Sequence, residues 1–164
     1  MDVLQRVTNE LVSTGITKTE YAGEITLHVP EAQLFDLLKN LKMHYGFDYL
    51  VDVVATDHYR DEFRFEIGYN LVNLTENKRL RVKALIANED KPEVESVVSL
   101  WPSANWYERE QFDMMGIEFR NHPDLRRIYM PEDFEYFPLR KEFPLIGIPG
   151  SIQMPEKDPP KGYK

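Results

Sequence analysis

Four charged side chains stand close together in the sequence, at Glu108, Arg109, Glu110 and Asp113. Carboxylates, together with the His122 imidazole that follows them, are groups that acid/base catalysis and metal binding require. An arginine among carboxylates is also typical of protein–protein contacts, in which arginine is over-represented. The charges therefore indicate either a catalytic cluster or a docking surface, and the rest of the chain has to distinguish the two.

Catalysis by this cluster would need further groups that the sequence does not supply nearby. A zinc site uses three or four convergent ligands, and a hydrolase needs a base that a second group orients. The other three histidines are scattered through the first half of the chain, there is no cysteine, and neither a glycine-rich phosphate-binding motif nor G-x-S-x-G occurs. We therefore expect no catalytic residue, metal or cofactor in this chain. A small metal-dependent hydrolase using Glu110, Asp113 and His122 is the alternative from a different class.

Length and composition bound the remaining possibilities. The 164 residues are enough for one domain with its own core, and 42% hydrophobic with 29% charged residues is typical of a folded chain. The net charge of −8, with no concentrated basic stretch, argues against nucleic acid as a partner. Because no apolar run approaches the roughly 20 residues of a spanning helix, we expect no transmembrane segment. The first residues carry too short an apolar stretch for a secretory signal, so residence on the cytoplasmic side is expected.

The spacing of apolar residues predicts an α+β domain. The expected helices are 3–11, 31–45, 94–101 and 105–115, and the expected strands are 24–29, 47–55, 63–72 and 79–87. Gly46 and Gly116 stand where left-handed residues would end two of the helices. The last two strands read as an antiparallel hairpin, so the fold class is a small domain with a mixed or antiparallel sheet and flanking helices.

The charged cluster itself falls on one of these helices. Ser103 or Asn105 can cap it after a proline, and Glu108 stands three residues past Asn105, which is the spacing of a capping box. Arg109 and Asp113 are four residues apart and can pair on one helix face. The pattern predicts a capped amphipathic helix that serves as a docking element.

Proline divides the chain into two parts. Ten of the eleven prolines follow residue 90, and eight of them fall within 117–164, too close together for regular helix or central strand. The same stretch carries many aromatic and aliphatic anchors, more than a solvated tail keeps. We therefore predict an α/β domain at 1–116 followed by an extended, proline-rich C-terminal arm at 117–164 that wraps a partner protein. The basic pairs at 126–127 and 140–141 would recognise carboxylates or helix C-termini on that partner.

The run "NWYEREQFDMMGIEFRNHPDLRRIYMPEDFEYFPLRKEFPL" at 105–145 resembles the signature region of the 30 kDa, or C, subunit of respiratory NADH:quinone oxidoreductase, complex I. Upstream, "YGFDYLVDVVATDH" at 45–58 is similar to the N-terminal domain of the same family. Two positions depart from it, since Phe137 and Glu142 stand where members often have histidine and aspartate. The positions that carry the resemblance are Glu108, Arg109, Glu110, Asp113, Gly116, His122, Pro123, Arg126, Arg127, Pro138, Leu139, Arg140 and Lys141.

The resemblance implies a non-catalytic peripheral-arm subunit on the cytoplasmic side of the cell (inner) membrane. The whole assembly passes electrons from NADH through flavin and iron–sulfur centres to quinone and couples this to proton translocation, with those cofactors held by partner subunits. The arm would run along the D subunit, the forty-nine-kilodalton type, near the terminal-cluster (B) subunit and other peripheral-arm subunits. The equivalent subunit of a related membrane-bound hydrogenase or other donor dehydrogenase is the close alternative. The partner-interface residues would be Trp106, Glu108, Arg109, Glu110, Asp113, His122, Pro123, Arg126, Arg127, Pro138, Leu139, Arg140 and Lys141.

Overall fold

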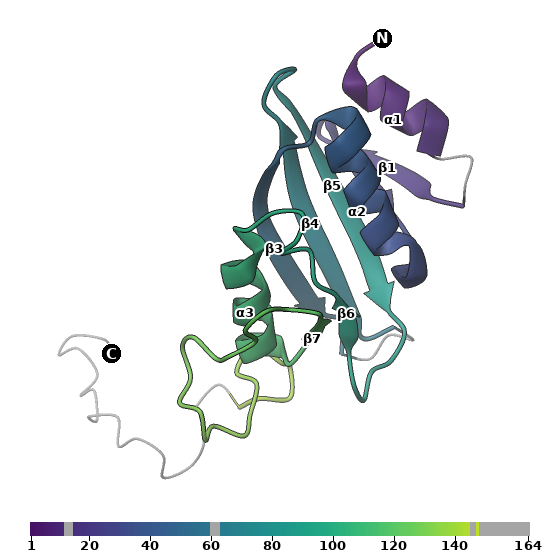
Figure 1. The fold of residues 1–164 in the computed structure, drawn as a ribbon. Coiled ribbons are helices and arrows are strands. Elements are labelled where there is room, and N and C mark those ends of the chain that lie inside the picture. Colours follow the sequence, from purple (N-terminus) through teal and green to yellow (C-terminus); the bar gives the residue numbers. More distant parts are fainter. Residues whose placement is uncertain (12–14, 60–62, 145–146, 148–164) are drawn as a thin grey trace, which may run out of the picture.

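The main body of the chain is a five-stranded sheet with helices packed on one of its faces (Figure 1). The computed structural model describes residues 1–11, 15–59, 63–144 and 147. The elements in chain order are α1 Val3–Leu11, β1 Thr17–Tyr21, β2 Glu24–His28, α2 Glu31–Tyr45, β3 Tyr49–Asp57, β4 Phe65–Asn73, β5 Lys78–Ile86, β6 Glu93–Glu95, α3 Ala104–Met115 and β7 Glu118–Arg120.

The sheet is mixed, as the sequence predicted. Its strand order is β1-β2-β5-β4-β3, in which β2 and β5 run parallel while the other neighbouring pairs run antiparallel. The predicted hairpin is β4–β5, whose register runs from Phe65 opposite Ile86 to Asn73 opposite Lys78. Alternate residues of both strands point into the core, which is the period of a sheet with one covered face. The α+β class is therefore confirmed.

Helix α2 lies over the sheet and buries the leucines at 34, 37, 38 and 41. It ends at Gly46, which has a φ of 69° and donates its backbone N–H to the Leu41 carbonyl, so the predicted left-handed stop is confirmed. Next to this helix end, Asn73 fixes the hairpin turn, because its side-chain oxygen accepts from the Glu76 N–H at 2.8 Å and its amide donates to the Tyr45 carbonyl at 2.8 Å. The turn and the helix end are thereby tied together.

The helix predicted at 94–101 is wrong. Residues 93–95 form β6, which pairs in parallel with β7, and only one helical turn follows, where Leu100 and Trp101 donate their N–H groups to the Val97 carbonyl. Val94, Val97, Leu100 and Trp101 are nevertheless buried. A short strand and a turn bury these side chains as well as a helix would, so the apolar spacing alone did not decide between them.

Strand β1 was not predicted from the sequence, because all five of its residues are exposed and they show no apolar alternation. It is an edge strand that pairs antiparallel with β2. A short, polar edge strand of this kind is a common way to leave a sheet edge without inviting further strand pairing.

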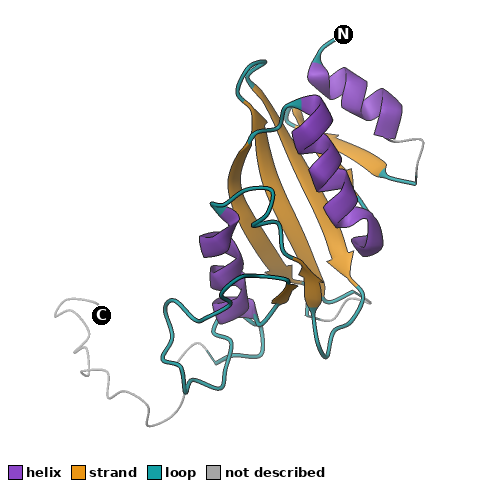
Figure 2. Cartoon of the chain, in the orientation of Figure 1, coloured by secondary structure: helices purple, strands orange, loops and turns teal. Residues whose placement is uncertain are grey.

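The α/β unit continues past the predicted boundary at residue 116. Ile117 and Phe119 are buried in the core, and Arg120 of β7 pairs with β6. Figure 2 shows the rest as loop that runs beside α3, and within its described residues, 121–144 and 147, no helix or strand is present. The division into a domain at 1–116 and a partner-wrapping arm at 117–164 stays a prediction, and residues 145–146 and 148–164 of that arm lie outside the described residues.

Candidate functional site

The candidate site is α3 together with the segment 121–144 beside it, since these hold the charged residues singled out by sequence. Glu108 does not form the predicted capping box. Its side chain is fully buried and accepts from the Val97 N–H at 2.7 Å and from the Ser96 hydroxyl at 2.7 Å, so it holds the turn after β6. Ser103 is the N-cap residue of α3 and makes no side-chain capping bond.

The environment of Glu108 is unusually apolar for a carboxyl group. Burial raises the pKa of Glu108 to about 7, because loss of water penalises the charged form more than the bonds from Ser96 and Val97 favour it. The Tyr69 hydroxyl, also buried, has no hydrogen-bond partner among the described residues. Burial, followed by the nearby Glu108 carboxylate, raises the pKa of Tyr69 well above its ordinary value, so Tyr69 stays neutral.

His122 lies next to Glu108, although no spacing in the sequence joins them. Its ring Nε2 is 3.9 Å from a Glu108 oxygen and 3.3 Å from the Asn105 carbonyl, and its Nδ1 accepts the Asp124 N–H at 3.0 Å. Because Nδ1 accepts, the ring proton sits on Nε2. Burial lowers the pKa of His122, so the imidazole is neutral at pH 7 and serves as a packing and hydrogen-bonding group.

Asp113 is the anchor of the segment after β7. One carboxylate oxygen accepts the consecutive backbone N–H groups of Ile128, Tyr129 and Met130 at 2.9, 2.6 and 3.0 Å, and the other pairs with Arg127 at 2.7 Å. Burial alone would raise the pKa of Asp113, but these four donors outweigh it and lower the pKa. The carboxylate is charged and fully used within the chain.

Arg109 does not pair with Asp113 as the i, i+4 spacing suggested. Its guanidinium donates instead to the carbonyls of Arg126 and Arg127 at 3.0 and 3.4 Å, and it lies 4.9 Å from the centre of the Trp106 ring. Helix α3 therefore holds the 126–130 loop by two charged residues: Asp113 binds its amides and Arg109 binds its carbonyls. We call this arrangement the first clamp.

A second clamp holds the segment at the C-terminal end of α3. Arg140 donates to the Met115 carbonyl at 2.7 Å and stacks on Phe137 at 4.4 Å. Gly116 ends α3 with a φ of 72°, and a Cβ there would lie 2.6 Å from the Phe137 ring and 2.7 Å from Arg140. The Leu139 N–H adds a bond to the Met114 carbonyl at 3.1 Å. Arg140 thus binds the C-terminus of α3, a helix of the same chain, and not that of a partner helix as the sequence suggested.

Sequence reasoning missed a third clamp, at the end of β3. Asp57 accepts from Arg64 at 2.9 and 3.0 Å and from the Lys141 N–H at 2.8 Å, and Arg64 also pairs with Glu142. Burial opposes the charge of Asp57, but the bonds from Arg64 and from the Lys141 and Tyr59 N–H groups together prevail and lower its pKa to about 2. One signal in the sequence could have identified Asp57. It stands two residues after Ala55 in the strand alternation, so a charged side chain occupies a position that points into the core.

The remaining interface candidates are less embedded. Pro123, Arg126 and Lys141 are exposed, and Arg126 pairs with Asp124 at 2.7 Å, whereas Glu110 and Pro138 are half-buried. Four large apolar side chains of α3 and the segment beside it are exposed, and we call them the apolar set: Trp106 (60%), Tyr129 (61%), Tyr136 (48%) and Leu139 (53%).

The hydrolase alternative finds little support in this geometry. Among the described residues, no group of three histidine, aspartate or glutamate side chains is arranged to hold a metal. Both oxygens of Asp113 are occupied by donors, and His122 faces Glu108 and the Asn105 carbonyl. The arrangement fixes backbone rather than presenting groups to a substrate.

Comparison with known proteins identifies the family. The model of the respiratory-chain NADH dehydrogenase 30 kDa subunit family matches residues 27–148. The chain belongs to this family. The match takes in α3, all three clamps and most of the sheet, so the residues that anchor the segment after β7 lie inside the region that defines the family.

Other members of the family agree over most of the chain. The C subunit of NADH-quinone oxidoreductase from Citrifermentans bemidjiense is 40% identical over 144 residues, covering 88% of this chain and 84% of the relative. The corresponding C 2 subunit from Rhizobium etli is 48% identical over 121 residues, covering 73% and 64%. NADH-ubiquinone oxidoreductase subunit 9 of Reclinomonas americana is 45% identical over 135 residues, covering 80% and 65%.

Solved structures share the fold. A trypsin-resistant fragment of Nqo5 is similar with a TM-score of 0.69 and 32% identity, covering 75% of this chain and 99% of the fragment. A chain in the structure of a membrane-bound sulfane sulfur reductase, an archaeal respiratory membrane complex, gives a TM-score of 0.75 at 22% identity, covering 88% and 85%. The second likeness concerns the fold alone. In the described part of this family member, no helix is long and apolar enough to cross a membrane.

Proposed function

We propose that this chain is a non-catalytic, peripheral-arm subunit of NADH:quinone oxidoreductase that docks and stabilises the D-type subunit. The whole complex would transfer electrons from NADH through flavin and iron–sulfur centres to quinone, coupled to proton translocation. Those cofactors would belong to partner subunits. The chain would lie on the cytoplasmic side of the cell membrane without a span of its own.

The observation that carries the proposal is that the charged side chains of this site bind the chain's own backbone, while several large apolar side chains are exposed to solvent. Four charged side chains form hydrogen bonds with backbone groups of the same chain: Glu108, Arg109, Asp113 and Arg140. They therefore fix the shape of the surface and are not available to react with a substrate. The apolar set stays exposed over this rigid frame. Exposed aromatic side chains held by fixed backbone are the features of a protein interface, where they bury much area at little entropic cost.

The D-type subunit would therefore meet the apolar set and the exposed basic residues at 126 and 141, with the terminal-cluster subunit and other peripheral-arm subunits nearby. This assignment refines the sequence-based prediction. The buried charges act as supports of the interface, and the apolar side chains make the contact.

Co-purification from cells that make the whole complex tests the proposal. Trp106→Ala combined with Leu139→Ala should lower the amount of D-type subunit recovered with the chain, because both side chains are exposed and would be buried at the interface. Thermal unfolding of the isolated variant should stay close to that of the unaltered chain. Tyr21→Ala is the matched control, since Tyr21 is an exposed aromatic residue on β1, outside this site. Equal recovery of the D-type subunit with all variants contradicts the proposal.

The equivalent subunit of a related donor complex is the second candidate, because a chain of the archaeal reductase complex has a similar fold and the fold alone does not separate the two candidates. The electron donor would bind another subunit, so this chain's surface does not separate the two. Mass spectrometry of the co-purified subunits does: a flavin-binding NADH subunit supports the first candidate, and a hydrogenase or other donor subunit in its place supports the second.

A further inference from the structure

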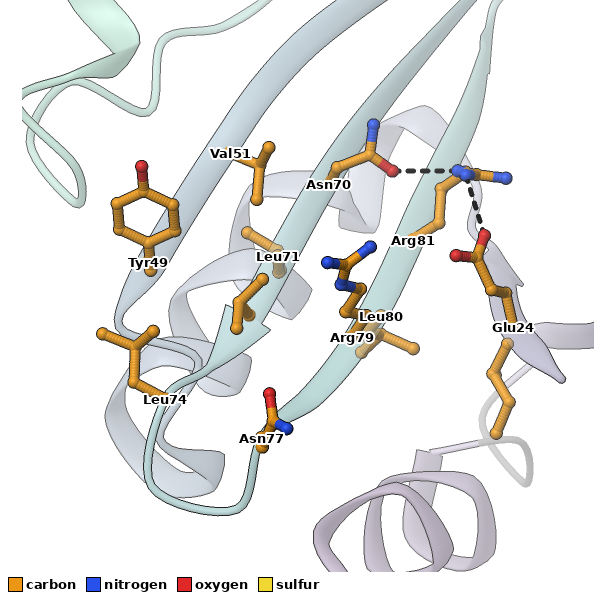
Figure 3. A pocket seen from close by; sticks show the side chains of 12 residues that line it. Glu24, Tyr49, Val51, Asn70, Leu71, Leu74, Asn77, Arg79, Leu80 and Arg81 are labelled. Atoms are coloured by element: carbon orange, nitrogen blue, oxygen red, sulfur yellow. Dashed lines mark hydrogen bonds and ion pairs between the residues drawn. The ribbon is translucent and has the colours of Figure 1, made fainter.

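A separate hollow lies on the open face of the sheet, away from α3. Across β5, β4 and β3, the residues Arg79, Val72 and Tyr49 are direct neighbours in register and form one row. Val51 and Leu74 border this row, and together the five residues line what we call the sheet hollow, of about 420 Å³. Figure 3 shows Tyr49, Val51, Leu74 and Arg79 in front of the strands, with helix behind the sheet.

A chain of hydrogen bonds forms one wall of the sheet hollow. Asn70 donates to Asp52 at 2.6 Å. Arg81 donates to Asn70 at 2.9 Å and to Glu24 at 3.2 Å (Figure 3). The chain links β3, β4, β5 and β2, so it joins four adjacent strands at the surface. Each polar side chain in this wall has a partner within the chain.

Arg79 is different from this wall. It is exposed, two residues before Arg81 on the same face of β5, and within the described part of the chain its guanidinium makes no hydrogen bond or ion pair. Three charged residues line the sheet hollow, Glu24, Arg79 and Arg81, and Asp52 stands just outside this lining as an acceptor for Asn70. Arg81 and Glu24 offset each other, so the lining itself keeps one positive charge, at Arg79, in a chain of net charge −8. Around it, Tyr49, Val51 and Leu74 are exposed apolar side chains.

We propose that the sheet hollow binds a segment of a neighbouring subunit that carries a carboxylate beside an apolar side chain. The carboxylate would pair with Arg79, whose planar fork suits it. The apolar side chain would cover Val51, Val72 and Leu74. This inference rests on the proposed function, because it assumes that the chain is part of a complex. The sheet hollow is distinct from the site at α3 and would be a second docking surface, on the face of the sheet that α2 does not cover.

A protein segment suits this site better than a free small acid. One exposed ion pair contributes only about 0–1 kcal/mol in water, which does not retain a small ligand. A segment already tethered by its subunit binds intramolecularly, so its effective concentration makes a weak, combined polar and apolar contact sufficient. The sheet hollow lies on a hydrogen-bonded sheet and needs no rearrangement to receive it.

Photo-crosslinking in the assembled complex tests this inference. A benzophenone amino acid replaces Leu74 at the rim of the sheet hollow, and Arg79→Glu is made in the same chain. Leu85 is the matched control position. It is an exposed leucine on the same face of β5 as Arg79, on the far side of Arg81 from the sheet hollow. Mass spectrometry identifies the crosslinked peptide, and thermal unfolding checks that Arg79→Glu leaves the chain folded.

We expect the probe at 74 to label one segment of a neighbouring subunit that contains aspartate or glutamate next to an apolar residue. Because Arg79→Glu replaces an attraction with a like-charge repulsion, it should lower that yield about tenfold, corresponding to about 1.4 kcal/mol, while any labelling from position 85 is unchanged. Replacing the partner's carboxylate with lysine should restore the yield in the Arg79→Glu chain. Absence of a crosslink, a crosslink to a second copy of this chain, or a yield independent of Arg79 would overturn the inference. In each of those cases co-purification of the chain with the complex would leave the proposed function standing, whereas failure to co-purify contradicts both.

Discussion

Asp113 and Arg127 form an ion pair of 2.7 Å that joins α3 to the segment after β7. Asp113 is fully buried and Arg127 nearly so, and the same carboxylate collects three consecutive backbone N–H groups. A buried carboxylate with this many donors determines the path of the chain around it. The 126–130 loop is therefore packed against α3, and Asp113 is the acceptor for its backbone N–H groups while Arg109 binds its carbonyls.

Asp113→Asn tests this dependence. The amide removes the charge that Arg127 requires and offers N–H groups where donors already point, so we expect the free energy of unfolding to fall by about 3–5 kcal/mol. Urea denaturation of the isolated chain measures this, and limited proteolysis should show new cleavage near 126–130. Asp124→Asn is the control, because Asp124 pairs with Arg126 at the surface, and it should change stability little. Similar stability of the two variants would contradict the anchoring role.

Gly116→Ala should be costly for two independent reasons. The φ of 72° is unfavourable for an L-residue, and the added Cβ would lie 2.6 Å from Phe137. We expect a loss of roughly 2–5 kcal/mol in the free energy of unfolding. Gly23→Ala, at a φ of 80° with no atom within 4 Å of the added Cβ, should lose only the backbone part, about 1–2 kcal/mol. In a Phe137→Ala background the cost at Gly116 should shrink, which a double-mutant cycle measures; an unchanged cost would mean that Phe137 is not what the Cβ meets.

The sequence predicted those parts of the fold that local patterns determine. Leu34 to Leu41 repeat at helical spacing and lie on α2, and the alternation in 63–72 and 79–87 belongs to the β4–β5 hairpin. Val94 to Trp101 misled because burial of such a short run is compatible with a strand and a turn.

The site was less predictable because its bonds connect distant residues. The i, i+4 rule paired Arg109 with Asp113, but backbone groups beyond residue 125 compete for both side chains and win. The capping-box spacing assigned Glu108 to the helix start, whereas the turn after β6 offers it two donors inside the core. Local rules count only neighbours in sequence, so they could identify the residues of the site and could not assign their partners.

Glu108 should make stability depend on pH near neutrality. Its pKa of about 7 in the folded chain exceeds the usual 4.5, so the folded state holds the proton more tightly. Stability from this group is full below about pH 4.5, falls as pH rises toward 7, and levels off above it. The loss is on the order of 3 kcal/mol, since each pKa unit corresponds to about 1.4 kcal/mol. Chemical denaturation at a series of pH values between 5 and 8 measures it.

Glu108→Gln provides the control for that measurement. The amide cannot ionise, so the fall between pH 5 and 7 should disappear while the volume is kept. His122 acts in the opposite direction, because its lowered pKa makes stability fall as pH drops below about 6.5. The difference between the unaltered chain and Glu108→Gln isolates the carboxyl contribution, and parallel pH curves for the two would rule out titration of Glu108 in this range.

Substitution of Arg140 tests whether this side chain stabilises the fold beneath the interface or contacts the partner directly. If its guanidinium serves the Met115 carbonyl and the Phe137 ring, Arg140→Ala should lower the free energy of unfolding of the isolated chain by about 1.5–3 kcal/mol, the usual range for a hydrogen bond to a charged group. Arg140→Lys should recover only part of this, because an ammonium neither stacks in plane nor donates from the same position. Urea denaturation of the three proteins without any partner measures these differences. A variant that is as stable as the unaltered chain but no longer co-purifies with the complex would instead assign Arg140 to direct contact with the D-type subunit.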